Sequence, residues 1–237
     1  AFSAEAGHFG LTNPSGYAAP ALADIDGDGD LDAFIGFMDG VTRFFRNTGT
    51  AIAANFTREA GALDLTGTGG YAQPTFADID GDGDLDVLVG NTAQPNLLLF
   101  RNVGSATAPA FVVEAGLPGI TSTELYPSPR AVDIDGDGDM DLVIGQDFVD
   151  DPVVYRNTGT AGAPHFTAEA GNFGLAGIGQ YARPTFVDID GDGDQDAVAG
   201  NFPGQLMFLE NTAPGIQFRQ SNGNTSVTEG GAGDSYT

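Results

Sequence analysis

The 237-residue chain contains no cysteine, no lysine and only two histidines. The absence of cysteine excludes disulfides, thiol nucleophiles and zinc sites built on thiolates. Eight arginines stand against 33 acidic residues, which gives a formal net charge of -25. This balance argues against binding to nucleic acid or to an anionic membrane surface, because basic side chains are needed to neutralise their phosphates. The remaining uses of such acidity are solubility and cation binding.

Long apolar runs are also missing. No stretch reaches the eighteen or so apolar residues of a membrane-spanning helix, and the opening AFSAEAGHFG lacks the charged and apolar regions of a signal peptide. We therefore expect no membrane insertion, and a mature or excised segment. Disorder is not expected, because 41% of the residues are hydrophobic and 17 are Phe, which is enough to form a core.

Aspartate is abundant, and it is arranged as DIDGDGDLD or a close variant four times. The clusters begin at Asp24, Asp78, Asp133 and Asp188, which are 54, 55 and 55 residues apart, and they hold 20 of the 33 acidic residues. Other features recur at the same phase: an EAG turn upstream, an apolar stretch ending in Gly after the cluster, and then FRNTG or a variant. A tyrosine precedes each cluster by seven residues: Tyr17, Tyr71, Tyr126 and Tyr181. The chain is a tandem array.

Each repeat holds about four short apolar stretches separated by Gly, Pro, Asn and Asp, which predicts strands and turns. Units of this size with four strands are typical of β-propeller blades, in which each sheet buries its faces against its neighbours. We predict an all-β, propeller-like array of four blades, each of four short antiparallel strands. The predicted units are 1–50, 51–104, 105–159 and 160–212. Residues 213–237 are interpreted as a terminal strand or linker that resembles the start of a following sandwich domain.

Aspartates at every second position of a glycine-containing loop repel one another and therefore suggest a bound cation. Ligands that are all oxygen, in a flexible loop, suit Ca²⁺ better than Mg²⁺. Positions 1, 3, 5 and 9 are expected to supply carboxylates and position 7 its backbone carbonyl, with Gly29 and its equivalents allowing the turn. An EF-hand is excluded, because position 12 is apolar in every copy. For any single copy the alternative is an ordinary Asp-Gly turn, which four near-identical copies disfavour.

We expect about four Ca²⁺ ions, one per repeat. The candidate metal-binding residues are Asp24, Asp26, Asp28, Asp30 and Asp32 in the first repeat; Asp78, Asp80, Asp82, Asp84 and Asp86 in the second; Asp133, Asp135, Asp137, Asp139 and Asp141 in the third; and Asp188, Asp190, Asp192, Asp194 and Asp196 in the fourth.

The pattern Asp-x-Asp-x-Asp-Gly-x-x-Asp, inside FADIDGDGDLDVLVGN and followed by LLLFRNVG, resembles the FG-GAP and VCBS repeats of integrin α-subunit propellers and bacterial surface proteins. HFGL at 8–11 and NFGL at 172–175 resemble the Phe-Gly element of that family. The resemblance covers residues 1 to about 218. It implies Ca²⁺ in a loop between adjacent strands of a blade, and a propeller usually built of seven blades. Four units leave a small ring, an open array or missing blades as alternatives.

Calcium in four similar loops is expected to be structural, and we expect no enzymatic activity. The histidines, His8 and His165, lie at unrelated phases of the repeat. The recurring glutamates of the EAG turn are candidates for a glycosidase pair, but their presence in every unit favours a structural role. These glutamates are Glu5, Glu59, Glu114 and Glu169.

Three functions stay open. The first is a Ca²⁺-stabilised structural or adhesive module of a bacterial-type surface protein, with a subunit of an extracellular filament as one form of it. The second is a carbohydrate-binding, lectin-like propeller, and the third is an accessory domain of a polysaccharide-degrading enzyme. The expected partners are other protein subunits, copies of the same chain, or surface ligands including glycans. An extracellular or cell-surface location is expected, because weak calcium modules need the calcium level found outside cells.

Overall fold

The computed structural model describes residues 10–11, 16–61, 63–67, 69–93, 95–120, 126–147, 151–175, 177–202, 204–211 and 219–221. The expectations for Glu5 and His8, and for residues 213–218 and 222–237 of the predicted terminal segment, lie outside these ranges. The helical element whose bounds the structure describes is the 3-10 turn η2 (Asn172–Gly174). No described helix is long and apolar enough to cross a membrane.

The strands form four antiparallel sheets of four strands each, in chain order within every sheet. The first sheet contains β1 (Ala18–Ala23), β2 (Asp32–Phe37), β3 (Thr42–Asn47) and β4 (Phe56–Glu59). The second contains β5 (Gln73–Ala77), β6 (Asp86–Gly90), β7 (Leu97–Asn102) and β8 (Phe111–Ala115). The third contains β9 (Ser128–Val132), β10 (Asp141–Gly145), β11 (Val153–Asn157) and β12 (Phe166–Ala168). The fourth contains β13 (Thr185–Val187), β14 (Asp196–Gly200), β15 (Leu206–Glu210) and β16 (Arg219–Ser221). The predicted all-β fold of four blades is confirmed.

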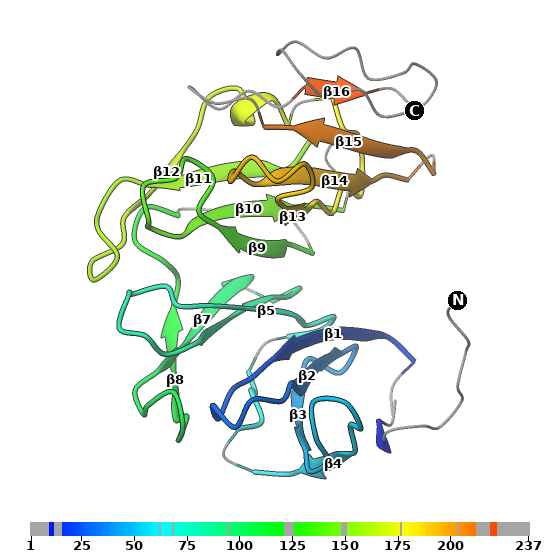
Figure 1. Cartoon of the computed structure of the whole chain (residues 1–237), viewed down its shortest axis with the longest axis vertical. Coiled ribbons are helices and arrows are strands. Elements are labelled where there is room, and N and C mark those ends of the chain that lie inside the picture. Colours follow the sequence, from blue (N-terminus) through cyan, green and yellow to red (C-terminus); the bar gives the residue numbers. More distant parts are fainter. Residues whose placement is uncertain are drawn as a thin grey trace.

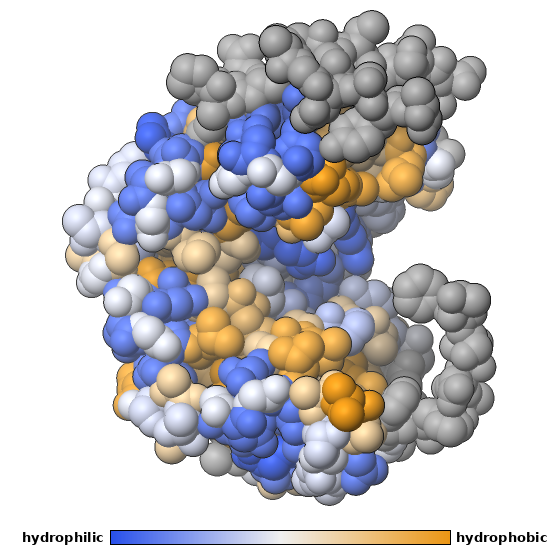
Figure 2. Space-filling model, in the orientation of Figure 1, coloured by the Kyte–Doolittle hydropathy of each residue, from blue (hydrophilic) through white to orange (hydrophobic). Residues whose placement is uncertain are grey.

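The four sheets follow one another around an arc in a propeller arrangement, from the first sheet at the bottom of Figure 1 to the fourth at the top. The first strand of each sheet lies toward the inside of the arc, and β1, β5 and β9 contact one another in turn. The arc leaves a hollow on one side, which the space-filling view shows (Figure 2). Side chains from different repeats therefore face a shared central space.

Three hydrophobic clusters of the described residues lie between neighbouring sheets, and a smaller one lies within the first sheet. For example, Phe34 and Phe44 of the first sheet share a buried cluster with Val87 and Val89 of the second. Similar clusters join the second sheet to the third and the third to the fourth. Burying one such side chain contributes roughly 1.5–3 kcal/mol, so each blade depends on its neighbour for stability.

The isoleucine at the second loop position shows this dependence clearly. Ile25, Ile79 and Ile134 are only 2%, 1% and 2% exposed, because the next sheet covers them. Ile189 occupies the same position in the fourth repeat and is 55% exposed. The outer face of the fourth sheet therefore lacks the cover that the other three receive.

A glycine is the last residue of β6, β10 and β14 and the next-to-last residue of β2. A Cβ atom added to Gly36, Gly90 or Gly145 would overlap the carbonyl oxygen of Ala72, Pro127 or Ala182, respectively. Gly200 has only the Gln205 carbonyl oxygen nearby, at 3.9 Å from an added Cβ. The first three glycines are thus required by close packing between neighbouring repeats.

Each sheet takes its first three strands from one predicted unit and its fourth from the next. β4 lies in the predicted unit 51–104 but pairs with β3, with Asn47 opposite Phe56. The side-chain oxygen of Asn47 accepts hydrogen bonds from the Gly49 and Asn55 N–H groups, which closes the hairpin between the two strands. In the same way β16, inside the predicted linker 213–237, pairs with β15. The predicted unit boundaries themselves stay a prediction.

Candidate metal centres in the aspartate loops

Each aspartate cluster forms the loop between the first and second strands of a sheet. In the first loop Gly27 and Gly29 have φ values of 70° and 91°, in the left-handed region that favours glycine. The glycine pairs of the other three loops have the same sign of φ. The sequence predicted a turn that requires glycine at the sixth loop position only, which is Gly29 in the first loop. The structure shows the same requirement at the fourth position, Gly27.

The first aspartate of the cluster holds the loop closed around its own carboxylate. The Asp28 and Gly29 N–H groups donate to the two Asp24 carboxylate oxygens, each at 3.1 Å. The Asp30 N–H donates to the Asp28 carboxylate at 3.0 Å. The second and third loops repeat this pattern. These hydrogen bonds fix the positions of the carboxylates within the loop.

The ninth aspartate links the loop to the rest of its sheet. In the second repeat the two oxygens of Asp86 accept hydrogen bonds from the Asn102 N–H at 2.7 Å and the Ile79 N–H at 3.1 Å. Asp141 and Asp196 accept the equivalent pairs of backbone hydrogen bonds. This residue was expected to close the metal coordination sphere, and its anchoring role was not predicted.

Three carboxylates converge in every loop, with ligand oxygens within 4.8 Å of one another. The groups are Asp24, Asp26 and Asp28; Asp78, Asp80 and Asp86; Asp133, Asp135 and Asp141; and Asp188, Asp190 and Asp192. Positions 1 and 3 thus contribute in all four loops, position 5 in two and position 9 in two. The carboxylates at position 7, Asp30, Asp84, Asp139 and Asp194, belong to none of these groups.

Some oxygens in these loops are buried without a hydrogen-bond partner. They include Asp26 Oδ1, Asp30 Oδ1, Asp32 Oδ2 and Asp80 Oδ1. A buried acceptor that lacks a partner is costly, especially on a charged group, and a bound cation would satisfy it. The donor set is oxygen only, which suits a hard cation such as Ca²⁺. The residues present therefore fit the metal that the sequence implies.

An arginine on the third strand braces three of the four loops, a feature that sequence reasoning missed. Arg46 pairs with Asp26 and, at 2.9 Å, with Glu59. Arg101 and Arg156 make the equivalent pairs with Asp80 and Glu114, and with Asp135 and Glu169. The recurring Arg-Asn dipeptide was the available signal in the sequence. Only the fold shows that its arginine pairs with the aspartate at position 3 of the loop. Glu59, Glu114 and Glu169 are thus partners of arginine.

The fourth loop differs, because Glu210 replaces this arginine and lies opposite Arg219 on β16. The third strand of the fourth sheet therefore lacks the arginine that braces the first three loops. We expect calorimetric titration with Ca²⁺ to resolve two classes of site in a ratio of three to one. Glu210→Arg is expected to merge them, and a single class in the unmodified chain would contradict this reading of the brace.

The ninth aspartates lead to a prediction for the calcium-free chain. Burial raises the pKa of Asp32, Asp86 and Asp141 to about 6. An unfolded aspartate titrates near pH 3.9, so the folded chain binds more protons than the unfolded chain between about pH 4 and 6. Its free energy of unfolding should fall as the pH rises through that window. In buffer stripped of divalent ions by a chelating resin, we expect a higher melting temperature at pH 5 than at pH 7.5.

Saturating Ca²⁺ should reverse this order, because a bound cation favours the charged carboxylates. A calcium-free melting temperature that rises from pH 5 to pH 7.5 would contradict the burial of these groups.

Three of the recurring tyrosines and His165 take part in contacts within the fold. The rings of Tyr17, Tyr71 and Tyr126 contact one another edge-on, with centroids 5.3 Å apart in both pairs. These three rings lie just before the inner strands β1, β5 and β9, so their contacts contribute to packing between the blades. The His165 N–H donates to Asn157 and so helps to close a hairpin.

Comparison with known proteins identifies the same repeat. A profile of the FG-GAP-like repeat matches the chain three times, at residues 24–89, 78–144 and 133–199. Each match begins at the first aspartate of one loop and runs into the second strand of the next sheet. The chain belongs to the FG-GAP-like repeat family. No curated protein matches its sequence significantly.

Among solved structures, the FG-GAP-like array resembles a lectin of Agrocybe aegerita, in a study of how it specifically recognises non-reducing terminal N-acetylglucosamine. The identity is 21% and the TM-score 0.51, over 86% of this chain and 51% of that one. This chain therefore spans about half the length of the lectin, and the likeness shows the fold alone. A second match is the Tc holotoxin pore of Photorhabdus luminescens, with 19% identity and a TM-score of 0.41 over 76% of this chain and 8% of that one.

Proposed function

We propose that this FG-GAP-like array is a non-catalytic, Ca²⁺-binding scaffold module of an extracellular or cell-surface protein. The observation that carries the proposal is the convergence of three carboxylates, within 4.8 Å, in each of four equivalent loops. Four copies of one site at the same position of four blades favour a structural use, because a reaction centre is usually single. Ca²⁺ would be held by the aspartates at positions 1, 3, 5 and 9.

The metal would act on stability through the link between the loop and its sheet. The loop joins the first and second strands, and its ninth aspartate is bonded to the third strand. If each loop is filled at about 100 times its dissociation constant, it contributes roughly 2.7 kcal/mol. Four such contributions are comparable with the roughly 5–15 kcal/mol of a whole domain. A chain built in this way would be stably folded only at a high calcium concentration.

The extracellular part of the proposal rests on affinity. Calcium modules of extracellular proteins bind at about 10⁻⁴ to 10⁻³ M, a level that the cytosol does not supply. We expect the chain to resist limited proteolysis at about 10⁻³ M Ca²⁺ and to be cut rapidly at about 10⁻⁷ M, with the same concentration of Mg²⁺ giving little protection. Equal cleavage rates at the two calcium levels would overturn this part of the proposal.

The next question is what a surface protein uses such a scaffold for: adhesion, filament formation or glycan binding. An adhesive or filament-forming role predicts that the calcium-loaded chain associates with itself or with a partner subunit. Sedimentation at increasing protein concentration tests the first case, and monomer alone at the highest concentration would argue against the filament. The likeness to a lectin supports a glycan array as the test of the lectin-like alternative. The role as an accessory domain of a polysaccharide-degrading enzyme stays a prediction.

A further inference from the structure

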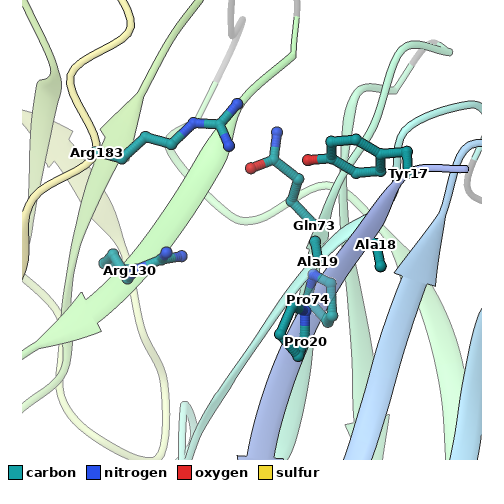
Figure 3. Close-up of a pocket in the computed structure, with 8 residues that line it drawn as sticks. All are labelled: Tyr17, Ala18, Ala19, Pro20, Gln73, Pro74, Arg130 and Arg183. Atoms are coloured by element: carbon teal, nitrogen blue, oxygen red, sulfur yellow. The ribbon is translucent and has the colours of Figure 1, made fainter. Parts of the chain in front are cut away.

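A pocket of about 250 Å³ lies at the centre of the arc, away from the aspartate loops. It is lined by the residues around the start of β1, by two residues of β5, by Arg130 on β9 and by Arg183 just before β13. Figure 3 shows the two arginines facing Tyr17 and Gln73 across this space. All four repeats therefore contribute to a single pocket.

The two arginines depart from the repeat that surrounds them. Arg183 lies two residues after the recurring tyrosine of its repeat. The other repeats have Ala19, Gln73 and Ser128 at this position. The position of Arg130 is held by Ala21, Thr75 and Thr185. Packing between blades is thus achieved without arginine at either position. Two departures that face the same space point to a role that is particular to this pocket.

The charge in the pocket is not fully compensated by the described residues. Arg183 pairs with Asp147 at 3.0 Å, and its side chain points toward Tyr17 across the pocket (Figure 3). Arg130 donates to the Pro129 carbonyl oxygen at 2.7 Å, and no described carboxylate forms an ion pair with it. Every other arginine whose side chain the structure describes has a carboxylate partner. Arg130 therefore leaves about one positive charge in the pocket.

Two further observations indicate that an anion would be favourable there. Burial, together with the charge of Arg183, lowers the pKa of Arg130, so the cation lies where water solvates it poorly. Gln73 is only 5% exposed, it lines the pocket, and no hydrogen bond joins its side-chain amide to another described residue. A guanidinium and an amide N–H are both donors that an oxyanion accepts.

The overall charge of -25 does not prevent anion binding at this place. Tyr17 and Asp24 lie at opposite ends of β1. At about 3.3 Å per residue they are separated by roughly 20 Å, more than two Debye lengths at physiological salt. The acidic loop is therefore largely screened from this end of the strand.

We propose that this pocket binds the oxyanion group, a carboxylate or sulfate, of a small ligand. Arg130 forms the principal contact, with Gln73 and Arg183 as further donors. The volume accommodates a group the size of one monosaccharide, since pockets for larger organic ligands usually exceed about 300 Å³. An acidic sugar or a small organic acid carries the required chemistry. The pocket is independent of the calcium loops, so its failure would leave the proposed scaffold role intact.

Calorimetric titration of the calcium-loaded chain with glucuronate, with inorganic sulfate and with glucose tests the proposal. Glucose has the same ring as glucuronate without the carboxylate, so it serves as the matched ligand control. We expect glucuronate, sulfate or both to bind, glucose not to bind, and the affinity to fall as salt is raised. Binding of glucuronate alone identifies a carboxylate ligand, and binding of sulfate alone identifies a tetrahedral one.

Arg130→Gln is expected to weaken binding about tenfold or more, because it removes a charge-assisted contact. Arg43→Gln makes the same change of charge on an arginine paired with Asp39 outside the pocket, and it should leave the affinity unchanged. Arg130→Lys keeps the charge and should give an intermediate loss, which also covers the case in which the glutamine variant does not fold. Absence of binding by the unmodified chain, equal binding of glucose, or full binding by the Arg130 variants would overturn the proposal.

Discussion

Replacing Gly90 by alanine is expected to destabilise the chain by about 2–3 kcal/mol, the upper part of the range for overpacked sites. The added Cβ would overlap the Pro127 carbonyl oxygen and lie 3.0 Å from the Pro129 ring. Neither neighbour is the end of a flexible side chain. The second and third sheets would have to move apart, and that movement would loosen the cluster between them. Urea unfolding in saturating calcium measures the loss.

Gly200→Ala is the matched control, because this glycine holds the same position in the fourth repeat. An added Cβ there has no neighbour nearer than the Gln205 carbonyl oxygen at 3.9 Å. The change should stay within about 0.5 kcal/mol of zero, as for surface substitutions. Equal losses at the two glycines would mean that the packing of neighbouring repeats does not set the requirement for glycine.

Asp86→Ala is expected to destabilise the chain both with and without calcium, by roughly 2–5 kcal/mol in chelator. The substitution leaves the buried Ile79 and Asn102 N–H groups without their acceptors, at about 1–3 kcal/mol each. In calcium the loss should be larger, because a candidate ligand is also removed. Urea unfolding in excess chelator and in calcium separates the two contributions.

Asp82→Ala provides the comparison within the same loop. Its side chain is exposed and accepts one hydrogen bond, from the Asp84 N–H at 3.0 Å. In chelator its effect should be below about 1 kcal/mol, and in calcium it should weaken the stabilisation by the metal. An Asp86 variant that is as stable as the Asp82 variant in chelator would show that position 9 does not anchor the loop.

The sequence carried enough information for the fold class and for the position of the loops. Its period of 54 to 55 residues and its short apolar stretches predicted four sheets, and the structure has them. The aspartates were expected to converge, and positions 1 and 3 do so in every loop. These features are local, so spacing alone reveals them.

Features that depend on contacts between distant residues were not predictable in the same way. The brace from Arg46 to Asp26 joins residues that are 20 apart, and it exists only because β3 returns beside the loop. The double hydrogen bond of Asp86 likewise needs the third strand in place. The pairing of β4 with β3, across the hairpin between them, also needs the folded sheet to be seen. The central pocket requires the arc itself, since its arginines come from different repeats.

The most direct test of the account is a calcium count combined with thermal unfolding of the same sample. The chain is stripped of metal, titrated with Ca²⁺ in a calorimeter, and then melted across the titration with Mg²⁺ as the comparison ion. We predict close to four bound Ca²⁺ per chain and a melting temperature that rises with calcium until the loops are filled. No bound calcium and a melting temperature that is unchanged by chelator would show that the aspartates form ordinary turns, and would contradict the central claim.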